Sequence, residues 1–262
     1  MRKYFRLFAI QLRISAASAI AYRANFLIEG VMSVAWLALT LLPLIVVYSA
    51  RDAVNGWDAP SALIVMAYFT ALRALLEGII SPSLVDLVEK IRSGSFDYVL
   101  LKPIDAQIVV SASKYEPWKI FDLLGGIAIA SYAFYLRGAP PAAADLALGL
   151  GLFVCGAVAM YSVWIVCAAA SFWVGRLDNL MYLLSAIFDT ARWPVQVFPA
   201  GWRFVFTFVI PVAIMTTFPA MALLGKLGAM TLVATIAGAL AMLVVSRVIW
   251  RAAIRSYTSA SS

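Results

Sequence analysis

Several apolar runs in this chain are long enough to cross a lipid bilayer, and they constrain its fold more than any other feature. Crossing the hydrocarbon core takes about 20 mostly apolar residues in a helix. The runs that reach or approach this length are residues 26–48, 62–80, 120–136, 146–174 and 227–249. Of the 262 residues, 64% are hydrophobic and only 13% are charged, whereas a soluble domain is about one quarter charged. The sequence therefore predicts an all-α polytopic membrane protein.

The stretch between residues 180 and 224 departs from this pattern. A shorter apolar run at residues 180–188 is followed by closely spaced prolines and charges, and residues 204–224 are apolar again. Irregular backbone at membrane depth is tolerated only where protein or water covers it. Two layouts are therefore open: residues 204–224 cross the membrane, or residues 190–224 form a re-entrant element that returns to the same side.

The distribution of basic residues favours the re-entrant layout. That layout has six transmembrane helices, with both termini on the side of the polar segment at residues 81–119. This side would hold fourteen Lys and Arg residues against five on the other, with Arg73 inside a span. Cytoplasmic loops carry an excess of Lys and Arg. We therefore expect one transmembrane domain over residues 1–262, with both termini in the cytoplasm.

The N-terminal segment, residues 1–23, has the basic start and small residues of a signal peptide. However, Arg6, Gln11 and Arg13 interrupt what would be its apolar region. On a helical wheel Arg2, Arg6 and Arg13 share one face, and apolar side chains share the opposite face. We expect an uncleaved amphipathic helix that lies in the membrane interface.

Residues 81–119 form the longest polar interruption in the chain. The Ser-Pro pair at residues 81–82 predicts a helix start, and Gly94 predicts its end. Asp86 and Lys90 are four residues apart and predict an ion pair on this helix. Such a helix is either a solvated connector or a contact for a soluble partner, and composition does not separate the two.

Charged residues also occur inside or beside the apolar runs, where they are functional candidates by default. Arg73 and Glu77 are four residues apart within one run, and Asp189 and Arg192 are three apart at the end of another. Asp122 lies near the start of a third run. These pairs either line a translocation path or lock helices together as structural pairs.

Aromatic and small residues give weaker signals. Trp193, Phe198 and Trp202 lie among the prolines, where they either gate the outer mouth of a path or form an ordinary interfacial belt. Gly149, Gly151 and Gly156, or Ala234 and Gly238, permit close helix approach. They do not identify a dimer face.

The sequence also limits the possible chemistry. It contains no Gly-x-x-x-x-Gly-Lys-Ser/Thr loop, so we expect that any ATP is bound by another polypeptide. It has no histidine, and Cys155 and Cys167 lie within one apolar run, which suits neither a metal site nor a disulfide framework. The net charge of +7 is spread along the flanks of the spans, which does not favour nucleic acid as a partner. We expect no catalytic site, bound cofactor or metal in this chain.

Three motifs resemble those of one transporter family. Residues 92–103, Arg-Ser-Gly-Ser-Phe-Asp-Tyr-Val-Leu-Leu-Lys-Pro, resemble the cytoplasmic signature that follows the second span in permeases of the ABC-2 type exporter family. The proline-punctuated stretches at residues 192–199 and 210–220 are similar to the region before the last span of these permeases, and residues 250–260 resemble their tail. Together with the order of the spans, the resemblance covers most of the chain.

The resemblance implies an ATP-driven exporter half in the bacterial cytoplasmic (inner) membrane. Such permeases have an interfacial N-terminal helix, six spans, a cytoplasmic coupling helix and a re-entrant element before the last span. They work as dimers, with a second copy or a related permease, and bind two separate ATPase subunits that hold ATP and Mg²⁺. The expected substrate is amphiphilic or hydrophobic.

By the same resemblance, residues 82–104 form the segment that couples the permease to the ATPase. The residues expected to carry this coupling are Leu84, Asp86, Leu87, Glu89, Lys90, Ile91, Gly94, Asp97, Lys102 and Pro103.

An alternative function for the whole protein is a secondary transporter driven by an ion gradient, with Arg73, Glu77 and Asp122 as a relay. A scaffold or sensor without transport activity is a third possibility.

Overall fold

A computed structural model describes the backbone of residues 2–173 and 178–257, and all their side chains except those of residues 2–7, 16, 18, 19, 178 and 179. Within these ranges five helices are long and apolar enough to cross a membrane, or six if one bent pair counts as a span. The prediction of a polytopic helical membrane protein is confirmed at this level.

The long helices coincide with the apolar runs of the sequence. They are α2 (Arg23–Ala50), α3 (Ala59–Leu75) with its continuations η1 (Leu76–Ile80) and α4 (Ser81–Arg92), α7 (Ile120–Arg137), α8 (Ala143–Ala169) and α12 (Ala229–Arg255). The shorter elements are α1 (Arg2–Ala21), β1 (Ala53–Val54), β2 (Trp57–Asp58), α5 (Asp97–Leu100), α6 (Ala106–Ser111), η2 (Pro117–Lys119), η3 (Ala170–Phe172), α9 (Asp178–Phe188), η4 (Asp189–Arg192), η5 (Val195–Val197), α10 (Ala200–Phe204), η6 (Val205–Val209), η7 (Ala213–Thr217) and α11 (Phe218–Leu223).

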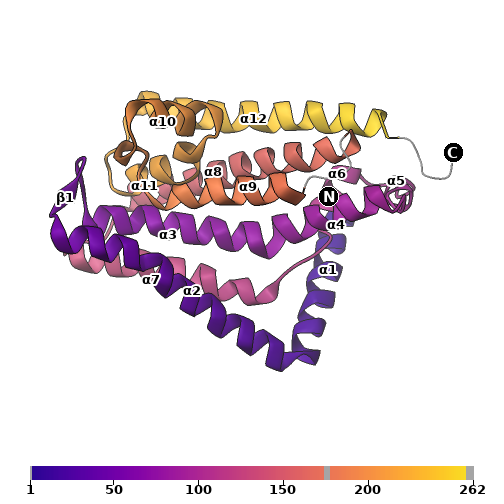
Figure 1. Cartoon of the computed structure of the whole chain (residues 1–262), viewed down its shortest axis with the longest axis horizontal. Helices are drawn as coiled ribbons and strands as arrows, with labels where there is room; N and C mark the ends of the chain where they lie inside the picture. Colours follow the sequence, from indigo (N-terminus) through magenta and orange to yellow (C-terminus); the bar gives the residue numbers. More distant parts are fainter. Residues whose placement is uncertain (1, 174–177, 258–262) are drawn as a thin grey trace.

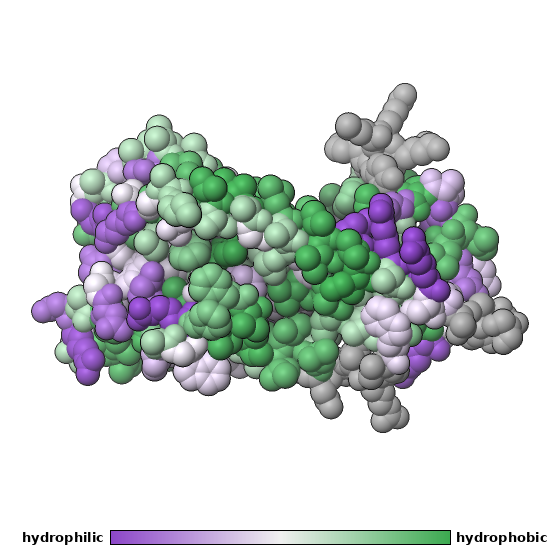
Figure 2. All heavy atoms as spheres, turned by 90° about the horizontal axis from the view of Figure 1, so that it is seen from above, coloured by the Kyte–Doolittle hydropathy of each residue, from purple (hydrophilic) through white to green (hydrophobic). Residues whose placement is uncertain are grey.

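The long helices lie side by side, and the shorter elements gather at the two ends of the bundle (Figure 1). The β1–β2 hairpin, α10 and α11 lie at one end, whereas α4, α5 and α6 lie at the other. The first turn of α1 and the last turn of α12 also lie near this second end. Figure 2 shows an apolar band across the middle of the molecule, with hydrophilic side chains concentrated toward both ends. This distribution is that of a protein whose middle lies in lipid.

Helix α3 is the centre of the bundle. It packs against α7 on one side and contacts η7 and α11 on another, while α8 packs against α12 and α11. In the most apolar stretch of the α3–α4 helix 72% of residues are buried, against 17% in α2 and in α12. The two outer helices therefore present their apolar side chains to lipid or to another protein.

Helix α4 begins at Ser81, as predicted, but it is not a separate helix. The backbone stays helical from Ala59 to Arg92 over 34 residues, with the π-helical turn η1 in its middle. Pro82 lies at the start of α4, and Ser81 still donates its N–H to the carbonyl of Leu76. The predicted connector helix is therefore an extension of the second span.

Helix α9 is shorter than the fifth predicted span requires. Its 11 residues extend about 16 Å at 1.5 Å per residue, against a hydrocarbon core of about 30 Å. The helices Ala200–Val209 and Ala213–Leu223 that follow meet at 79°. The six-span layout therefore stays a prediction. The end of the fourth run at residue 174 and the polar turn at residues 175–177 lie outside the described residues.

Candidate functional site

The 82–104 segment, which is predicted to couple the protein to a partner, contains α4 and the turn at Gly94 that ends this helix. Gly94 adopts a left-handed φ of 73°, which glycine accepts without strain, and α4 ends just before it. The N–H of Phe96 then bonds to the carbonyl of Lys90 at 3.0 Å. The chain turns back at this point into α5, and the predicted stop at Gly94 matches the structure.

The predicted coupling residues divide between an inner and an outer side of this segment. Leu84 and Leu87 are fully buried and Ile91 is half-buried against the core, so this apolar stripe packs on the protein itself. Asp86 also faces the protein: its carboxylate is 2.5 Å from Lys90 Nζ and accepts a hydrogen bond from Ser113 at 3.0 Å. Asp86 therefore holds the returning chain against α4, through Ser113 and Lys114.

The outer side of the segment combines charged and large apolar side chains. Glu89 pairs with Arg92 at 2.8 Å, and both side chains are mostly exposed. Tyr98 and Leu101 are 73% and 79% exposed. Val85, Lys102 and Pro103 are also exposed. We call the surface formed by Val85, Glu89, Tyr98, Leu101, Lys102 and Pro103 the outer face of the 82–104 segment.

Phe96 anchors the segment to the end of the bundle. It is fully buried, and its ring contacts those of Phe172, Trp250 and Tyr257, with centroids 5.3, 6.4 and 5.2 Å away. These edge-on contacts are a favourable geometry for aromatic rings. The first and the last of the three sequence motifs therefore meet in one aromatic cluster, a contact that sequence reasoning did not predict.

An ion pair ties the same segment to the last long helix. Both terminal nitrogens of Arg247 donate to the carboxylate of Asp105, and Nη1 also donates to Gln107 Oε1 at 2.5 Å. Gln107 in turn donates to the hydroxyl of Tyr161 in α8 at 3.0 Å. The hydrogen bond from Arg247 and its positive charge hold the pKa of Asp105 below its ordinary value. Sequence analysis missed this site, because Tyr161 and Arg247 lie more than 50 positions along the chain from Asp105 and Gln107.

The predicted pairs Arg73–Glu77 and Asp189–Arg192 belong to one larger network. Arg73 Nε lies 2.7 Å from Glu77 Oε1, and Arg73 Nη1 lies 3.5 Å from Asp189 Oδ1. Arg192 Nη2 lies 3.6 Å from the other oxygen of Asp189. The guanidinium groups of Arg73 and Arg192 both lie about 6 Å from the ring of Phe69.

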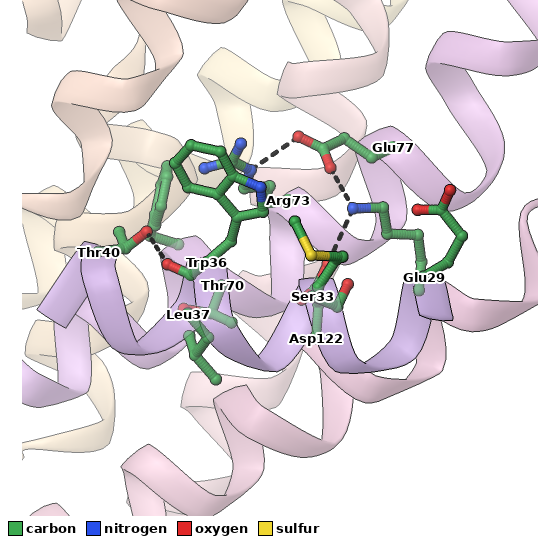
Figure 3. Close-up of a pocket in the computed structure, with 12 residues that line it drawn as sticks. Glu29, Ser33, Trp36, Leu37, Thr40, Thr70, Arg73, Glu77 and Asp122 are labelled. Atoms are coloured by element: carbon green, nitrogen blue, oxygen red, sulfur yellow. Dashed lines mark hydrogen bonds and ion pairs between the residues drawn. The ribbon is translucent and has the colours of Figure 1, made fainter. Parts of the chain in front are cut away.

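Lys119 extends this network toward α7. Its ammonium group lies 2.5 Å from Glu77 Oε2 and 3.2 Å from Asp122 Oδ2 (Figure 3). We call the resulting series of alternating charges the charge chain; it consists of Arg192, Asp189, Arg73, Glu77, Lys119 and Asp122. Its three cations and three anions cancel, which lowers the cost of placing them in the apolar part of the molecule. The three-residue spacing of Lys119 and Asp122 was a sequence signal for this contact.

The charge chain borders a cavity of about 410 Å³ between α2, α3 and α7. Glu77, Arg73, Lys119 and Asp122 line one side, and α2 contributes the other, including Glu29, Ser33, Trp36 and Thr40 (Figure 3). Glu77 lies in the π turn η1, and such turns are frequent at functional sites. The cavity therefore offers charges, hydroxyl groups and aromatic faces at the level of the spans.

The three aromatic residues predicted as an outer gate are only partly brought together. Phe198 and Trp202 both contact the ring of Phe206, at 5.0 and 5.7 Å. Trp193 is half-buried against the core, and the described part of the chain shows no ring contact between it and this pair. Trp202 is 58% exposed, which is typical of an interfacial side chain.

Among the residues described, no group of three or more His, Cys, Asp or Glu side chains is arranged to hold a metal ion. Cys155 and Cys167 are free thiols in α8.

These features define a multi-pass helical membrane protein with a charged cavity among its spans. Residues 34–261 match the family model described as "ABC-2 family transporter protein", and the chain therefore belongs to the ABC-2 transporter family. No curated protein and no solved structure gives a significant match. The predicted resemblance is confirmed: the chain is a permease of an ABC transporter. The ion-gradient alternative gains no support from this result.

Proposed function

We propose that this protein is the permease of an ABC exporter that moves an amphiphilic or hydrophobic substrate outward across the bacterial inner membrane. A separate ATPase subunit, present in two copies, would bind ATP and Mg²⁺ and drive the transport. The observation that best supports this proposal is the outer face of the 82–104 segment. Its exposed Tyr98 lies in α5 and its exposed Leu101 directly follows that helix, at the end of the molecule where Figure 1 shows α5. Large exposed apolar side chains are typical of a protein contact.

The connection between this face and the spans supports a mechanical role. Helix α4 is continuous with α3, and Leu84 and Leu87 are fully buried in the core. A partner that moves the outer face would therefore move the inner end of α3 with it. Glu77, in the π turn between α3 and α4, would pass this displacement to the charge chain.

The cavity between α2, α3 and α7 is our candidate for part of the translocation path. Helix α2 is mostly unburied, and a second permease, either another copy or a related chain, would cover it. Arg73, Glu77, Asp189 and Arg192 would then either line the path or lock its walls. We place the outer gate near Trp193, Phe198 and Trp202, at the end of the molecule opposite α4.

Six crossings account for the positions of the chain ends. In this layout α9 with η4 forms the short fifth crossing, and the bent pair of helices, 200–223, re-enters from the end that carries the β hairpin. Both termini then lie in the cytoplasm, and α1, which runs across the direction of the long helices in Figure 1, lies in the interface.

The function is tested by the variant Leu101→Asp. Leu101 is 79% exposed, so the fold should tolerate the change. A charge placed in an apolar contact would weaken ATPase binding, and we expect at least a tenfold loss of co-purified ATPase, equivalent to about 1.4 kcal/mol. Substrate-stimulated ATP hydrolysis in proteoliposomes should fall with it.

Arg255→Asp provides the matched control, because Arg255 is also exposed and lies at the same end of the molecule, outside the segment. It should leave ATPase capture unchanged. If Leu101→Asp retains full capture and full stimulated hydrolysis, the outer face is not the ATPase contact. Transport by the isolated chain without an ATPase would overturn the proposed function itself.

A further inference from the structure

A second pocket lies outside the charged cavity, where α1 and the start of α2 meet the chain that leads into η2. Its volume is about 260 Å³, which is below the roughly 300–1,000 Å³ of sites for drug-sized molecules. Aromatic residues form much of the wall, and Glu116 supplies a carboxylate. The side chains that the argument uses are Tyr22, Asn25, Phe26, Tyr115, Glu116 and Trp118.

The chemistry of this pocket favours a cation. Aromatic faces attract cations, and a carboxylate provides the opposite charge. The nearby lysines are engaged elsewhere: Lys114 pairs with Asp86, and Lys119 pairs with Glu77 and Asp122. Burial and the negative charge of Glu29 raise the pKa of Glu116, and the positive charges of Lys114 and Lys119 offset part of this rise. Within the described part of the chain, Glu116 has no salt bridge, so the pocket has a carboxylate without a resident cation.

The polar groups of the pocket favour a cation that carries N–H donors. Asn25 also lines the pocket and has an amide oxygen that can accept a hydrogen bond. The hydroxyl of Tyr115 is buried and has no hydrogen-bond partner among the described residues. A primary ammonium has three donors for such acceptors, whereas a trimethylammonium group has none. The pocket therefore suits an aminoethyl head group better than a choline.

An apolar groove continues from the pocket. A cavity of about 380 Å³ shares Tyr115, Glu116 and Pro117 with it and is lined further on by Leu75 and Leu123. A third cavity, of about 550 Å³, shares Leu123 with the second and runs between α3, α7 and α8. A head-group pocket followed by two apolar cavities matches the polar and apolar parts of a phospholipid. The polar end of such a lipid would lie beside α1, and its acyl chains would lie along α7.

We propose that this pocket and groove bind phosphatidylethanolamine in the leaflet on the side of α4–α6. The ammonium group lies against Glu116 and the rings of Tyr22 and Trp118, and an acyl chain fills the groove between Leu75 and Leu123. The bound lipid connects α1 to the chain segment that precedes α7. The head-group pocket shares no lining residue with the charged cavity, whereas the groove and the charged cavity both include Lys119 in their walls.

The test measures lipid retention by the full-length protein in nanodiscs of equal phosphatidylethanolamine, phosphatidylcholine and phosphatidylglycerol, by native mass spectrometry. We expect roughly tenfold enrichment of phosphatidylethanolamine, because the binding free energy that corresponds to this factor is that of about one cation–π or ion-pair contact. Glu116→Gln should abolish the enrichment, since it removes the charge and keeps the shape and the backbone N–H bond to Gly78. Tyr115→Phe, which removes only one hydroxyl, should reduce the preference over phosphatidylcholine. Glu89→Gln, an exposed carboxylate at the same end, should leave it unchanged.

Three outcomes would overturn the proposal. One is equal retention of the three lipids by the wild type, and another is full enrichment in a folded Glu116→Gln variant. The third is displacement of the lipid by an equal concentration of soluble phosphoethanolamine, which would identify a free amine, rather than a membrane lipid, as the ligand. None of these readouts requires transport, so failure here leaves the proposed exporter function intact.

Discussion

Asp105 has two roles that stabilise the end of the molecule formed by α4, α5 and α6. Its carboxylate accepts hydrogen bonds from Arg247 of α12, and it caps α6 by accepting from the N–H of Gln107 at 3.0 Å. Both interactions are stronger when the carboxylate is ionised. The pKa of Asp105 is correspondingly below its ordinary value of 3.8, and the first cause is the hydrogen bond from Arg247.

Asp105→Asn should therefore lower stability in a pH-dependent way. A lowered pKa means that the stabilisation is fully present above the ordinary pKa and is lost as the pH falls through the lowered value. The wild type should unfold at a higher temperature than the variant at pH 7, and the difference should shrink below about pH 4. Thermal unfolding in detergent between pH 7 and pH 3 measures it, with the exposed loop variant Asp52→Asn as the control. A difference that is constant over this range would contradict the prediction.

The sequence predicted side-chain contacts correctly where the two residues lie close together in the chain. The pairs Arg73–Glu77 and Asp86–Lys90 form as their four-residue spacing predicts. The sequence did not predict the contact of Arg73 with Asp189, because that contact depends on how α9 and η4 pack against α3. The same limit explains why Leu84 and Asp86 were expected among the coupling residues, although their side chains pack mainly on the protein itself.

At the scale of elements, two glycines of α8 allow the helix to contact the region after α10. A Cβ at Gly156 would lie 2.7 Å from the carbonyl oxygen of Met215 in η7, and one at Gly149 would lie 3.0 Å from Leu223 in α11. These residues are seven apart and share one face of α8. Gly151 points into open space. The sequence predicted close approach at Gly149, Gly151 and Gly156; the prediction was wrong for Gly151, and it did not identify η7 and α11 as the partners.

Gly156→Ala should push α8 and η7 apart, because the obstacle is backbone and cannot rotate away. Overpacking of this kind costs about 1–3 kcal/mol. Gly151→Ala should be neutral or slightly stabilising, since alanine is the better helix former. The comparison is the thermal unfolding temperature of the two purified variants, and equal temperatures would show that the contact between α8 and η7 is loose.

The length of an apolar run predicted the long helices well, but it did not predict where helices bend or join. Residues 62–80 and 82–93 were expected as two helices, and they form one, because the Ser81-Pro82 pair is compatible with a continuing helix. Residues 204–224 contain enough apolar residues for a span but bend by 79° near Pro211. The bend reflects proline and local packing, which hydropathy does not measure.

At the scale of the whole molecule, the hydropathy of the surface separates a middle band from two polar ends (Figure 2). The β1–β2 hairpin marks one end and the 82–104 segment the other (Figure 1). An odd number of crossings between the hairpin and this segment places them on opposite sides of the membrane, and α3 is the one helix between them. The excess of basic residues on its side predicts that the 82–104 segment faces the cytoplasm.

Cysteine labelling in intact cells tests this orientation. With Cys155 and Cys167 replaced by alanine, a single cysteine at the exposed position of Asp52 should react with a membrane-impermeant maleimide added outside. A cysteine in place of Tyr98 should react only after the cells are permeabilised. Reaction of the Tyr98→Cys variant in intact cells would reverse the orientation and remove the ATPase contact from the 82–104 segment.

The helix that begins at Ala59 does not end until Arg92, and this has a consequence for how force travels through the molecule. A rod of 34 residues is about 50 Å long at 1.5 Å per residue, so a tilt imposed at its inner tip swings the far tip in the opposite sense. Near its middle this helix is held by the ion pair between Lys119 and Glu77 and by the hydrogen bond that the backbone N–H of Glu116 donates to the carbonyl of Gly78. A fulcrum at this point would let a push from the inner side open the far side, without any loop having to transmit it.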